Sequence, residues 1–328
     1  MKNLKNLFAI CLLAMVSFYA CNNEDDVNEV VPDEIIEAPT TEEFRQLQTS
    51  AIDQIRQEAQ FEAEDGIQFE SEKGVALEIF EGTLKLNGED VTGTVDLEFI
   101  EIFDAGSMVT TNKPTMGLKE SGSKALLISG GEFYINVTQN GDQLEISNHM
   151  KLVIPTDLTG GPDQEMTLWN GQIDDNDNLA WDEDRGGADG AGNLFVEGDQ
   201  YYSFLSGFGW TNVDRFYNDP RPKTTLEVIV PDGYHIQNSS VYLYYDGEPY
   251  ALAQLDTFDE NANSFSEHYG EIPIGLEMHV IFVTEEDGEW KYSIQPQTVE
   301  DGDVYTFEED DFIIGTESDV YNAIDALP

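Results

Sequence analysis

The sequence predicts an all-β protein made of two antiparallel β-sandwich domains, with an N-terminal helix and an irregular acidic middle segment. The sandwiches are predicted because apolar and polar residues alternate through residues 64–157 and again through residues 223–308. Turn dipeptides such as Asn-Gly and Asp-Gly interrupt both regions, as between the strands of hairpins. The helix is predicted because apolar residues recur at helical spacing within residues 40–63.

Residues 1–20 have the composition of a secretory signal and end directly before a cysteine. Lys2 and Lys5 precede an apolar run at 7–18, and Ala20 precedes Cys21. The arrangement resembles the lipobox of bacterial lipoproteins, which implies that the signal is removed and that Cys21 is acylated with palmitate or a similar chain. The acidic residues that follow resemble the surface-export signal of Bacteroidetes lipoproteins. These resemblances imply a lipid-anchored protein of the outer membrane that faces the cell exterior.

Two other interpretations of this segment stay open. The first is ordinary secretion after cleavage behind Ala20. The second is a membrane-spanning helix, for which the apolar run is shorter than the roughly 20 residues that a bilayer requires.

The composition excludes several classes of partner. Lys and Arg total 15 against 66 Asp and Glu, which gives a formal net charge of −51. This charge repels nucleic-acid phosphates and anionic lipid headgroups, so we expect no nucleic-acid partner and no membrane attachment besides the lipid. Cys11 belongs to the signal and Cys21 carries the lipid, so the mature chain is left without a disulfide.

Residues 21–39 are mostly acidic or small and predict a flexible tether. Thr40 and Glu43 have the spacing of a capping box, which predicts the start of a helix. The helix is predicted to cover residues 40–63, because five apolar residues share one face of it. These residues are Phe44, Leu47, Ala51, Ile55 and Ala59.

Residues 64–157 are predicted to form the first sandwich, with hairpin turns at Asn87-Gly88 and Asn140-Gly141. Residues 158–222 are predicted to form a middle β segment with an Asp-rich loop, either a small domain of its own or an extension of the first sandwich. Residues 223–308 contain seven short apolar runs between turns and are predicted to form a second sandwich. Residues 309–328 are predicted to be an acidic tail, with a short helix at 320–327.

Several segments of the chain resemble a family of Bacteroidetes surface lipoproteins that is built from β-sandwich domains. They are residues 69–75 (FESEKGV), 91–104 (VTGTVDLEFIEIFD), 112–117 (NKPTMG), 129–141 (SGGEFYINVTQNG) and 207–216 (GFGWTNVDRF). The second sandwich is similar to the carboxypeptidase-regulatory-like, prealbumin-like class through residues 272–275 (IPIG). These resemblances imply the fold and the location of the protein, but no reaction.

The Asp-rich loop is the best candidate for a metal site. Calcium binds roughly six to eight oxygen ligands from a flexible loop, and the loop is rich in carboxylate and amide oxygens. The predicted ligands are Asp174, Asn176, Asn178, Asp182, Asp184 and Asp189. The alternative is a solvated loop without a metal, and the spacing does not match an EF-hand.

Aromatic residues of the middle segment suggest a platform on which a sugar ring could stack. The residues are Trp169, Trp181, Tyr201 and Trp210. Core packing is the favoured alternative, since Trp and Tyr are usually buried at least in part. A buried ion pair between Asp214 and Arg215 is also predicted, with a structural role.

The sequence identifies no catalytic residue. The four histidines are scattered without a zinc-binding spacing, and no nucleophile motif is present. We therefore expect a non-enzymatic structural or interaction protein, whose partners are the membrane lipid through Cys21 and another surface protein or a glycan. The alternative is a carbohydrate-binding lipoprotein, and the third interpretation is a glycan-acting hydrolase.

Overall fold

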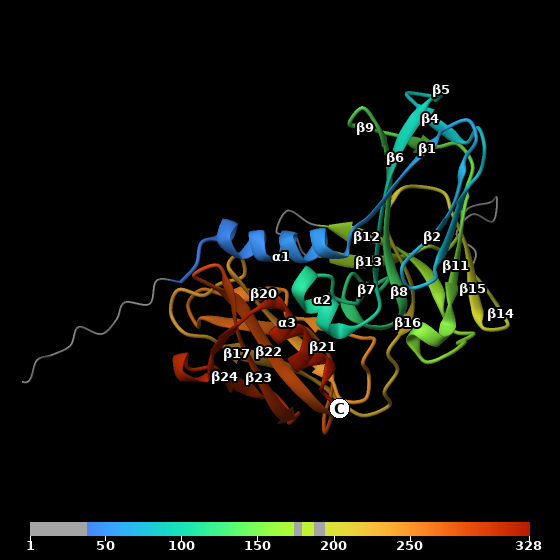
Figure 1. Ribbon diagram of the computed structural model, residues 1–328. Coiled ribbons are helices and arrows are strands. Elements are labelled where there is room, and N and C mark those ends of the chain that lie inside the picture. Colours follow the sequence, from blue (N-terminus) through green and yellow to red (C-terminus); the bar gives the residue numbers. More distant parts are fainter. Residues whose placement is uncertain (1–37, 174–178, 187–193) are drawn as a thin grey trace, which may run out of the picture. The chain divides into compact units, whose positions relative to one another are not determined.

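The computed structural model describes residues 38–173, 179–186 and 194–328, and all of these belong to one compact unit. The fold is all-β, as predicted, with three α-helices in the described part of the chain (Figure 1). The helices are α1 (Thr41–Ile55), α2 (Ala105–Thr111) and α3 (Glu317–Asp325).

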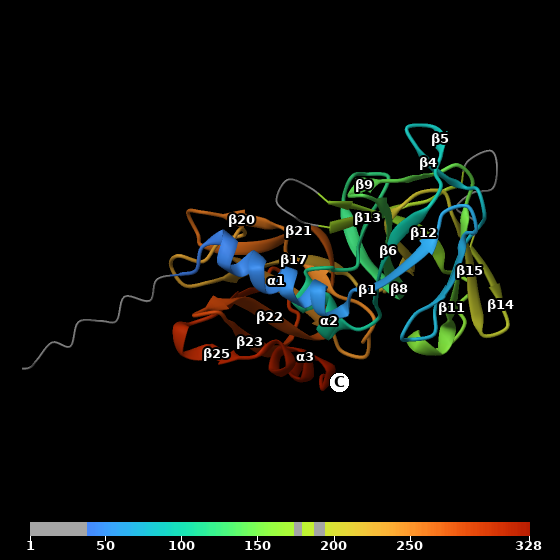
Figure 2. The same cartoon turned by 45° about the horizontal axis from the view of Figure 1, so that its top comes forward.

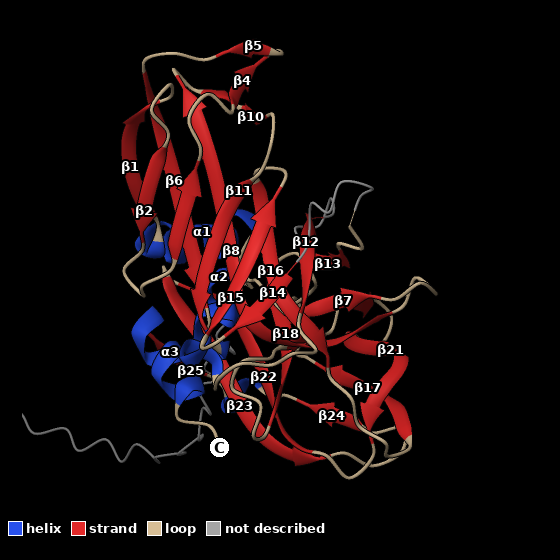
Figure 3. Ribbon diagram, turned by 90° about the vertical axis from the view of Figure 1, so that its right-hand side faces the viewer, coloured by secondary structure: helices blue, strands red, loops and turns tan. Residues whose placement is uncertain are grey.

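Two sheets form the first sandwich and pack around a shared apolar core, as the two layers of strands in Figure 3 show. The large sheet has the order β1 (Gln57–Glu62), β6 (Thr94–Ile102), β8 (Lys124–Gln139), β16 (Gly209–Phe216), β12 (Thr167–Ile173), β13 (Leu179–Glu183) and β7 (Met116–Leu118), and β9 (Asp142–Gln143) pairs with β8. The facing sheet has the order β14 (Leu194–Glu197), β15 (Gln200–Leu205), β11 (Met150–Pro155), β3 (Ala76–Ile79) and β2 (Ile67–Glu70). A small sheet contains β10 (Glu145–Ile146), β4 (Leu84–Leu86) and β5 (Glu89–Asp90).

The predicted hairpin turns are confirmed. Asn87 and Gly88 have φ angles of 52° and 84°, and Asn140 and Gly141 have φ angles of 53° and 89°. Both residues of such a turn need a positive φ, which Asn and Gly adopt more readily than other residues do. These turns fix the register of the hairpins on either side of them.

The middle segment is an extension of the first sandwich. Its strands β12, β13 and β16 belong to the large sheet, and its strands β14 and β15 belong to the facing sheet. Apolar and polar residues alternate only weakly in this segment because β13 and β16 are buried on both faces. A strand that is covered on both sides has no polar face.

The N-terminal helix is shorter than predicted. The capping box is present, since Thr40 N donates to Glu43 Oε2 at 2.8 Å and Glu43 N donates to Thr40 Oγ1 at 3.3 Å. However, α1 ends at Ile55, and residues 57–62 form the edge strand β1. Ala59 fits both the helical spacing and the alternation of this strand, so its position does not distinguish the two structures.

The second sandwich consists of a four-stranded and a five-stranded sheet. The four-stranded sheet has the order β20 (Thr257–Asp259), β21 (Ser264–Pro273), β17 (Lys223–Ile229) and β24 (Val304–Thr306). The five-stranded sheet has the order β19 (Ala253–Gln254), β18 (Ser239–Tyr245), β22 (Glu277–Glu286), β23 (Glu289–Thr298) and β25 (Ile313–Gly315). Pairing is antiparallel except between β17 and β24 here and between β13 and β7 in the large sheet.

The C-terminal residues belong to the fold and do not form a free tail. After a short 3-10 turn at Glu309–Asp311, β25 pairs with β23, and α3 buries Val320 and Ile324. The short helix was predicted, although it begins a few residues earlier, at a capping box of Thr316 and Asp319. The acidic composition hid the two apolar positions that hold this helix in place.

The three helices pack together between the large sheet and the five-stranded sheet (Figure 2). Phe44 of α1 meets Trp290 of β23 edge to face, with 6.1 Å between the ring centroids. Met108 of α2 and Ile324 of α3 are fully buried in the same cluster. This cluster gives the two sandwiches a second, shared core.

Backbone hydrogen bonds also join the two sandwiches. Thr115 N donates to Leu252 O at 2.9 Å, and Leu252 N donates to Thr115 Oγ1 at 2.9 Å. Ser129 N donates to Tyr250 O at 3.0 Å. The loop between β18 and β19 therefore pairs with the first sandwich along its backbone.

Candidate functional site

Three of the four aromatic residues predicted to form a stacking platform are core residues. Trp169, Trp181 and Tyr201 are 1%, 0% and 0% exposed. Trp169 Nε1 donates to Asp214 O at 3.0 Å, and Trp181 Nε1 donates to Pro114 O at 3.0 Å. The prediction of an exposed four-ring platform is therefore wrong. Tyr201 packs in the core of the first sandwich, whereas Trp169 and Trp181 pack with Leu127 and Leu179 in a smaller cluster on the other face of the large sheet. The indole N–H groups find carbonyl partners in that cluster.

Trp210 is the fourth residue of that set, and it is half-buried on the outer face of the large sheet. It lies opposite Tyr134 across β16 and β8, with 5.4 Å between the ring centroids. Lys113 Nζ lies 5.3 Å from the centroid of the Trp210 ring, which is within reach of a cation–π contact. The sequence did not identify Tyr134, because only the register of the two strands brings it beside Trp210.

A groove with a volume of about 520 Å³ lies on the same face of the large sheet. Two cross-strand rows of polar side chains, contributed by β1, β6 and β8, form its floor. The rows are Glu58, Glu98 and Asn136, and Gln60, Asp96 and Thr138. Ile100 and Tyr134 form the next row, so the aromatic pair lies adjacent to the groove.

The polar side chains of the groove are held by their neighbours. Arg56 Nε lies 2.6 Å from Glu98 Oε1, and Gln60 Nε2 donates to Asp96 Oδ1 at 2.6 Å. Asn136 Oδ1 has no hydrogen-bond partner among the described residues. Burial raises the pKa of Tyr134, and the nearby Glu98 carboxylate raises it further. The groove thus presents both donors and acceptors, held on a sheet, to a polar ligand.

The Asp-rich loop is described only in part. Asp182 is exposed, and Asp184 Oδ1 accepts a hydrogen bond from Gly186 N at 2.9 Å. The other predicted calcium ligands, Asp174, Asn176, Asn178 and Asp189, lie outside the described residues. Within the described ranges, no cluster of three His, Cys, Asp or Glu side chains is placed to hold a metal. Calcium binding therefore stays a prediction.

A cluster of buried polar side chains lies where β8 and β16 pair irregularly. Asn212 pairs with Glu132, but Asp214 pairs with Ser129, so β8 contributes one extra residue between these pairs. Ser129 Oγ donates to Asn212 Oδ1 at 2.9 Å, and Asn212 Nδ2 donates to Asp214 Oδ2 at 2.6 Å. All four side chains are 0% exposed.

The two carboxyl groups of this cluster are held away from water. Both oxygens of Glu132 and Oδ1 of Asp214 have no hydrogen-bond partner among the described residues. Burial raises the pKa of Glu132 well above its usual range, and the Asp214 carboxyl raises it further, although Lys113 opposes the shift. Burial also raises the pKa of Asp214 well above its usual range. A charged carboxylate is unfavourable in such surroundings, so protonation is favoured.

The predicted ion pair between Asp214 and Arg215 does not form. Asp214 faces the buried cluster, whereas Arg215 is directed to Asp163, with 2.6 Å between Arg215 Nε and Asp163 Oδ2. Adjacent residues of a strand point to opposite faces of the sheet, which separates these two side chains.

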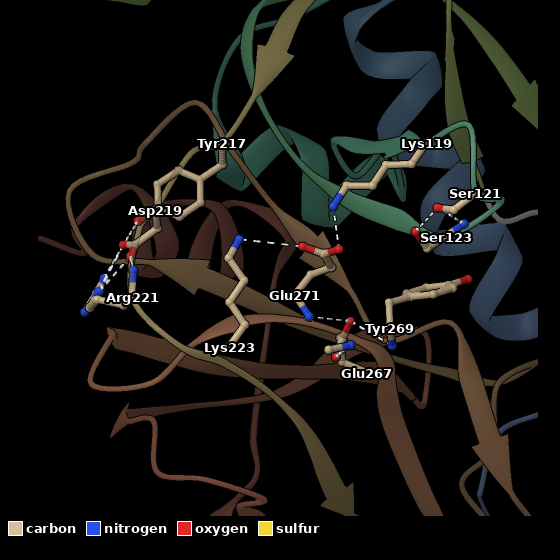
Figure 4. Close-up of polar contacts among 11 residues, drawn as sticks. Lys119, Ser121, Ser123, Tyr217, Asp219, Arg221, Lys223, Glu267, Tyr269 and Glu271 are labelled. Carbon is tan, nitrogen blue, oxygen red and sulfur yellow. Dashed lines mark hydrogen bonds and ion pairs between the residues drawn. The ribbon is translucent and has the colours of Figure 1, made fainter.

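Basic residues gather where the chain passes from the first sandwich to the second (Figure 4). Lys119 and Lys223 both pair with Glu271, and the Lys223 Nζ to Glu271 Oε2 distance is 3.6 Å. Arg221 pairs with Asp219 at 2.6 Å and holds the pKa of that carboxyl well below its usual range. In these contacts, the Lys and Arg side chains neutralise acidic residues at the junction of the two sandwiches.

Glu267 lies in the same region and is nearly buried. Its carboxylate accepts hydrogen bonds from the backbone N–H groups of Tyr269 and Gly270, both at 3.0 Å. Burial nevertheless raises its pKa, and the backbone hydrogen bonds reduce the shift. The side chain is thus used to hold an irregular turn within β21.

The predicted lipidation residue, Cys21, lies outside the described residues. The described part of the chain contains no helix that is long and apolar enough to span a membrane. No protein-family model matches the chain, and no curated protein matches it at a significant level.

Proposed function

We propose that the protein is a lipid-anchored lipoprotein of the outer membrane, exposed at the cell surface, with a non-enzymatic interaction role. The sequence supports the anchor through Cys21 and the acidic residues directly after it. The observation that carries the interaction role is the open groove on the outer face of the large sheet. Its side chains are fixed on three paired strands, which suits the binding of a partner.

The chemistry of the acidic residues also favours binding over catalysis. Glu132 and Asp214 have the raised pKa values that general acids need, but both are fully buried and cannot contact a substrate. The groove carboxylates Glu98 and Asp96 are instead held by Arg56 and Gln60.

A photo-reactive amino acid placed at Asn136 tests the interaction role on intact cells. Asn136 lies in the groove, so irradiation should yield one discrete cross-linked species. The matched control places the same group at Glu89, which is exposed on a hairpin away from the groove. Identical products from both positions, or none from either, would contradict a partner in the groove.

Carbohydrate binding is the second candidate function, and the aromatic pair favours it. Tyr134 and Trp210 lie beside a groove of carboxylate and amide groups, and sugar rings bind to such combinations of stacking and hydrogen bonding. A glycan array tests this candidate. Binding that is lost in Trp210→Ala and retained in Trp210→Phe would support it, and an array without hits would contradict it.

A further inference from the structure

Apolar side chains are exposed along one short stretch of the second sandwich. Val304, Ile313 and Ile314 are 54%, 56% and 51% exposed, and they lie within eleven consecutive residues. Val304 begins β24, and the two isoleucines begin β25. Single exposed apolar residues are common, but a concentration of them marks a surface that associates with something else.

Both strands lie at the edge of their sheets. β24 ends the four-stranded sheet and β25 ends the five-stranded sheet, so in the described part of the chain the outer side of each carries no strand. Edge strands have backbone N–H and C=O groups that are free to pair with another extended chain. Each of these two edges therefore presents backbone hydrogen-bonding groups together with an exposed apolar side chain.

The segment between the two strands is anchored in the core. Phe307 is 1% exposed, and the Phe312 ring stacks on Phe282 with 4.7 Å between the centroids. Phe307 and Phe312 lie 6.0 Å apart. This packing holds β24 and β25 in place, so a partner strand would meet a preformed edge.

The charge around this edge indicates what kind of chain it accepts. Four consecutive acidic residues, 308–311, directly precede Phe312 and β25. The nearby Lys291 is occupied, since its Nζ lies 2.7 Å from Glu286 Oε2 and 3.0 Å from Glu309 Oε2. A second copy of this chain would bring the same acidic run and a net charge of −51, and would be repelled. A segment with basic residues would be attracted.

We propose that β25 accepts an extended segment of a partner protein as an additional strand. Ile313 and Ile314 are adjacent in β25 and point to opposite faces of the sheet, so apolar side chains on both faces of that segment cover them. Its Lys or Arg side chains face the acidic run at 308–311. The inference deepens the proposed interaction role, and it rests on that role only for the presence of a partner outside the cell.

A fluorescent ten-residue peptide in which pairs of valines alternate with single lysines is the probe, with the full mature chain as the receptor, because each valine pair presents one apolar side chain to either face of the sheet. Anisotropy should show binding that weakens by about tenfold or more in the double variant Ile313→Thr, Ile314→Thr. Threonine keeps the β-branched shape, so the strand should still form. The matched control is Ile173→Thr, which removes an isoleucine that is 49% exposed on β12 and should leave binding unchanged.

A second peptide separates strand pairing from general attraction to an acidic protein. It has the same side chains but is methylated at every backbone nitrogen, which removes the N–H donors from both edges of the peptide strand. The proposal expects this peptide to bind about tenfold more weakly or worse. Equal binding of both peptides, or equal binding to the isoleucine double variant and to Ile173→Thr, would overturn it. A dimer of the wild-type chain that dissociates in the isoleucine double variant would also overturn it.

The experiment is independent of the membrane anchor. Failure of the peptide test would remove β25 as the docking edge and leave the groove and the acylation of Cys21 untouched. Failure of acylation would leave the peptide result unchanged, because the probe is tested on the purified chain.

Discussion

Gly131 shows how one residue determines the geometry of the buried cluster. Its φ angle is +127°, and a Cβ atom at this position would lie 2.6 Å from Cε1 of Phe103. Any other residue would therefore be strained and would collide with a core ring. Gly131 lies in the irregular pairing of β8 with β16, which places Ser129 and Glu132 in one buried cluster with Asn212 and Asp214.

Replacing Glu132 with glutamine should change how stability depends on pH. Folding raises the pKa of Glu132, so the folded protein retains a proton that the unfolded protein releases above about pH 4.3. The stability that Glu132 contributes is therefore greatest below that pH and falls as the pH rises toward the raised pKa. Relative to Glu132→Gln, the loss should approach about 1.4 kcal/mol per pH unit. Urea unfolding of both proteins from pH 4 to 8 measures the difference, and parallel curves would contradict it.

At the scale of residues, the sequence pointed to the aromatic residues of the middle segment but did not show which of them are exposed. Trp169 and Trp181 were considered both as platform residues and as core residues, and burial alone decides between these roles. Burial depends on which strands are neighbours, and the sequence does not contain that information directly. The same applies to Tyr134, whose contact with Trp210 exists only through the pairing of β8 with β16.

At the scale of elements, local patterns predicted strands and turns well and helices less well. The helix α2 was missed because it has only seven residues and no long apolar stripe. Its signals were the two caps: Asp104 Oδ1 accepts a hydrogen bond from Ser107 N at 2.8 Å, and Asn112 ends the helix with a φ angle of 54°. Caps without periodicity occur in many turns, so they did not suffice. Strands β20 and β25 have three residues each and were also missed.

Helix α3 should contribute measurably to stability although it lies in the acidic C-terminal stretch. Ile324 is 0% exposed in the cluster shared by the two sandwiches. Ile324→Ala should lower the free energy of unfolding by about 2–4 kcal/mol. Ile313→Ala is the matched control and should change it by less than about 0.5 kcal/mol, because that side chain is largely exposed. Equal effects in urea titrations would mean that α3 does not pack as described.

The Asp-rich loop supports a prediction of its own. If its oxygens bind calcium only in the folded protein, calcium in excess should raise the melting temperature relative to chelator. The double variant Asp182→Asn, Asp184→Asn retains the size of the side chains and removes two charges, so its melting temperature should respond less. Superimposed melting curves of the wild type with calcium and with chelator would exclude a tight site.

At the scale of the molecule, the sequence predicted two sandwiches but not how closely they are joined. The joining contacts link residues far apart in the chain, such as Tyr242 OH, which donates to Asn112 Oδ1 at 2.6 Å, and Thr115 with Leu252. In the sequence, each of these residues looks like an ordinary polar or loop residue. The junction is recognisable only when the contacts are seen together, and no local sequence pattern indicates which residues pair.

The ion pair of Lys124 with Asp256 tests this junction. Its Nζ to Oδ2 distance is 2.6 Å, and the side chains are 14% and 11% exposed. Lys124→Ala should lower the free energy of unfolding by about 1–2 kcal/mol, because Asp256 is left with one weak donor, Tyr269 OH at 3.3 Å. Lys85→Ala is the control: its partner Asp90 is 76% exposed, so the loss should stay below about 1 kcal/mol. A larger loss of unfolding free energy in Lys85→Ala than in Lys124→Ala would contradict a stabilising role of the Lys124–Asp256 ion pair at the junction.

The central claim is that this all-β fold stands outside the cell on a lipid attached to Cys21. Intact cells treated with added protease, followed by immunoblotting with an antibody against the second sandwich, test it most directly. The account predicts that the wild-type protein is degraded while a periplasmic marker survives, and that Cys21→Ser no longer remains with the cells. Survival of the wild-type protein on protease-treated cells, or retention of Cys21→Ser in the membrane fraction, would contradict it.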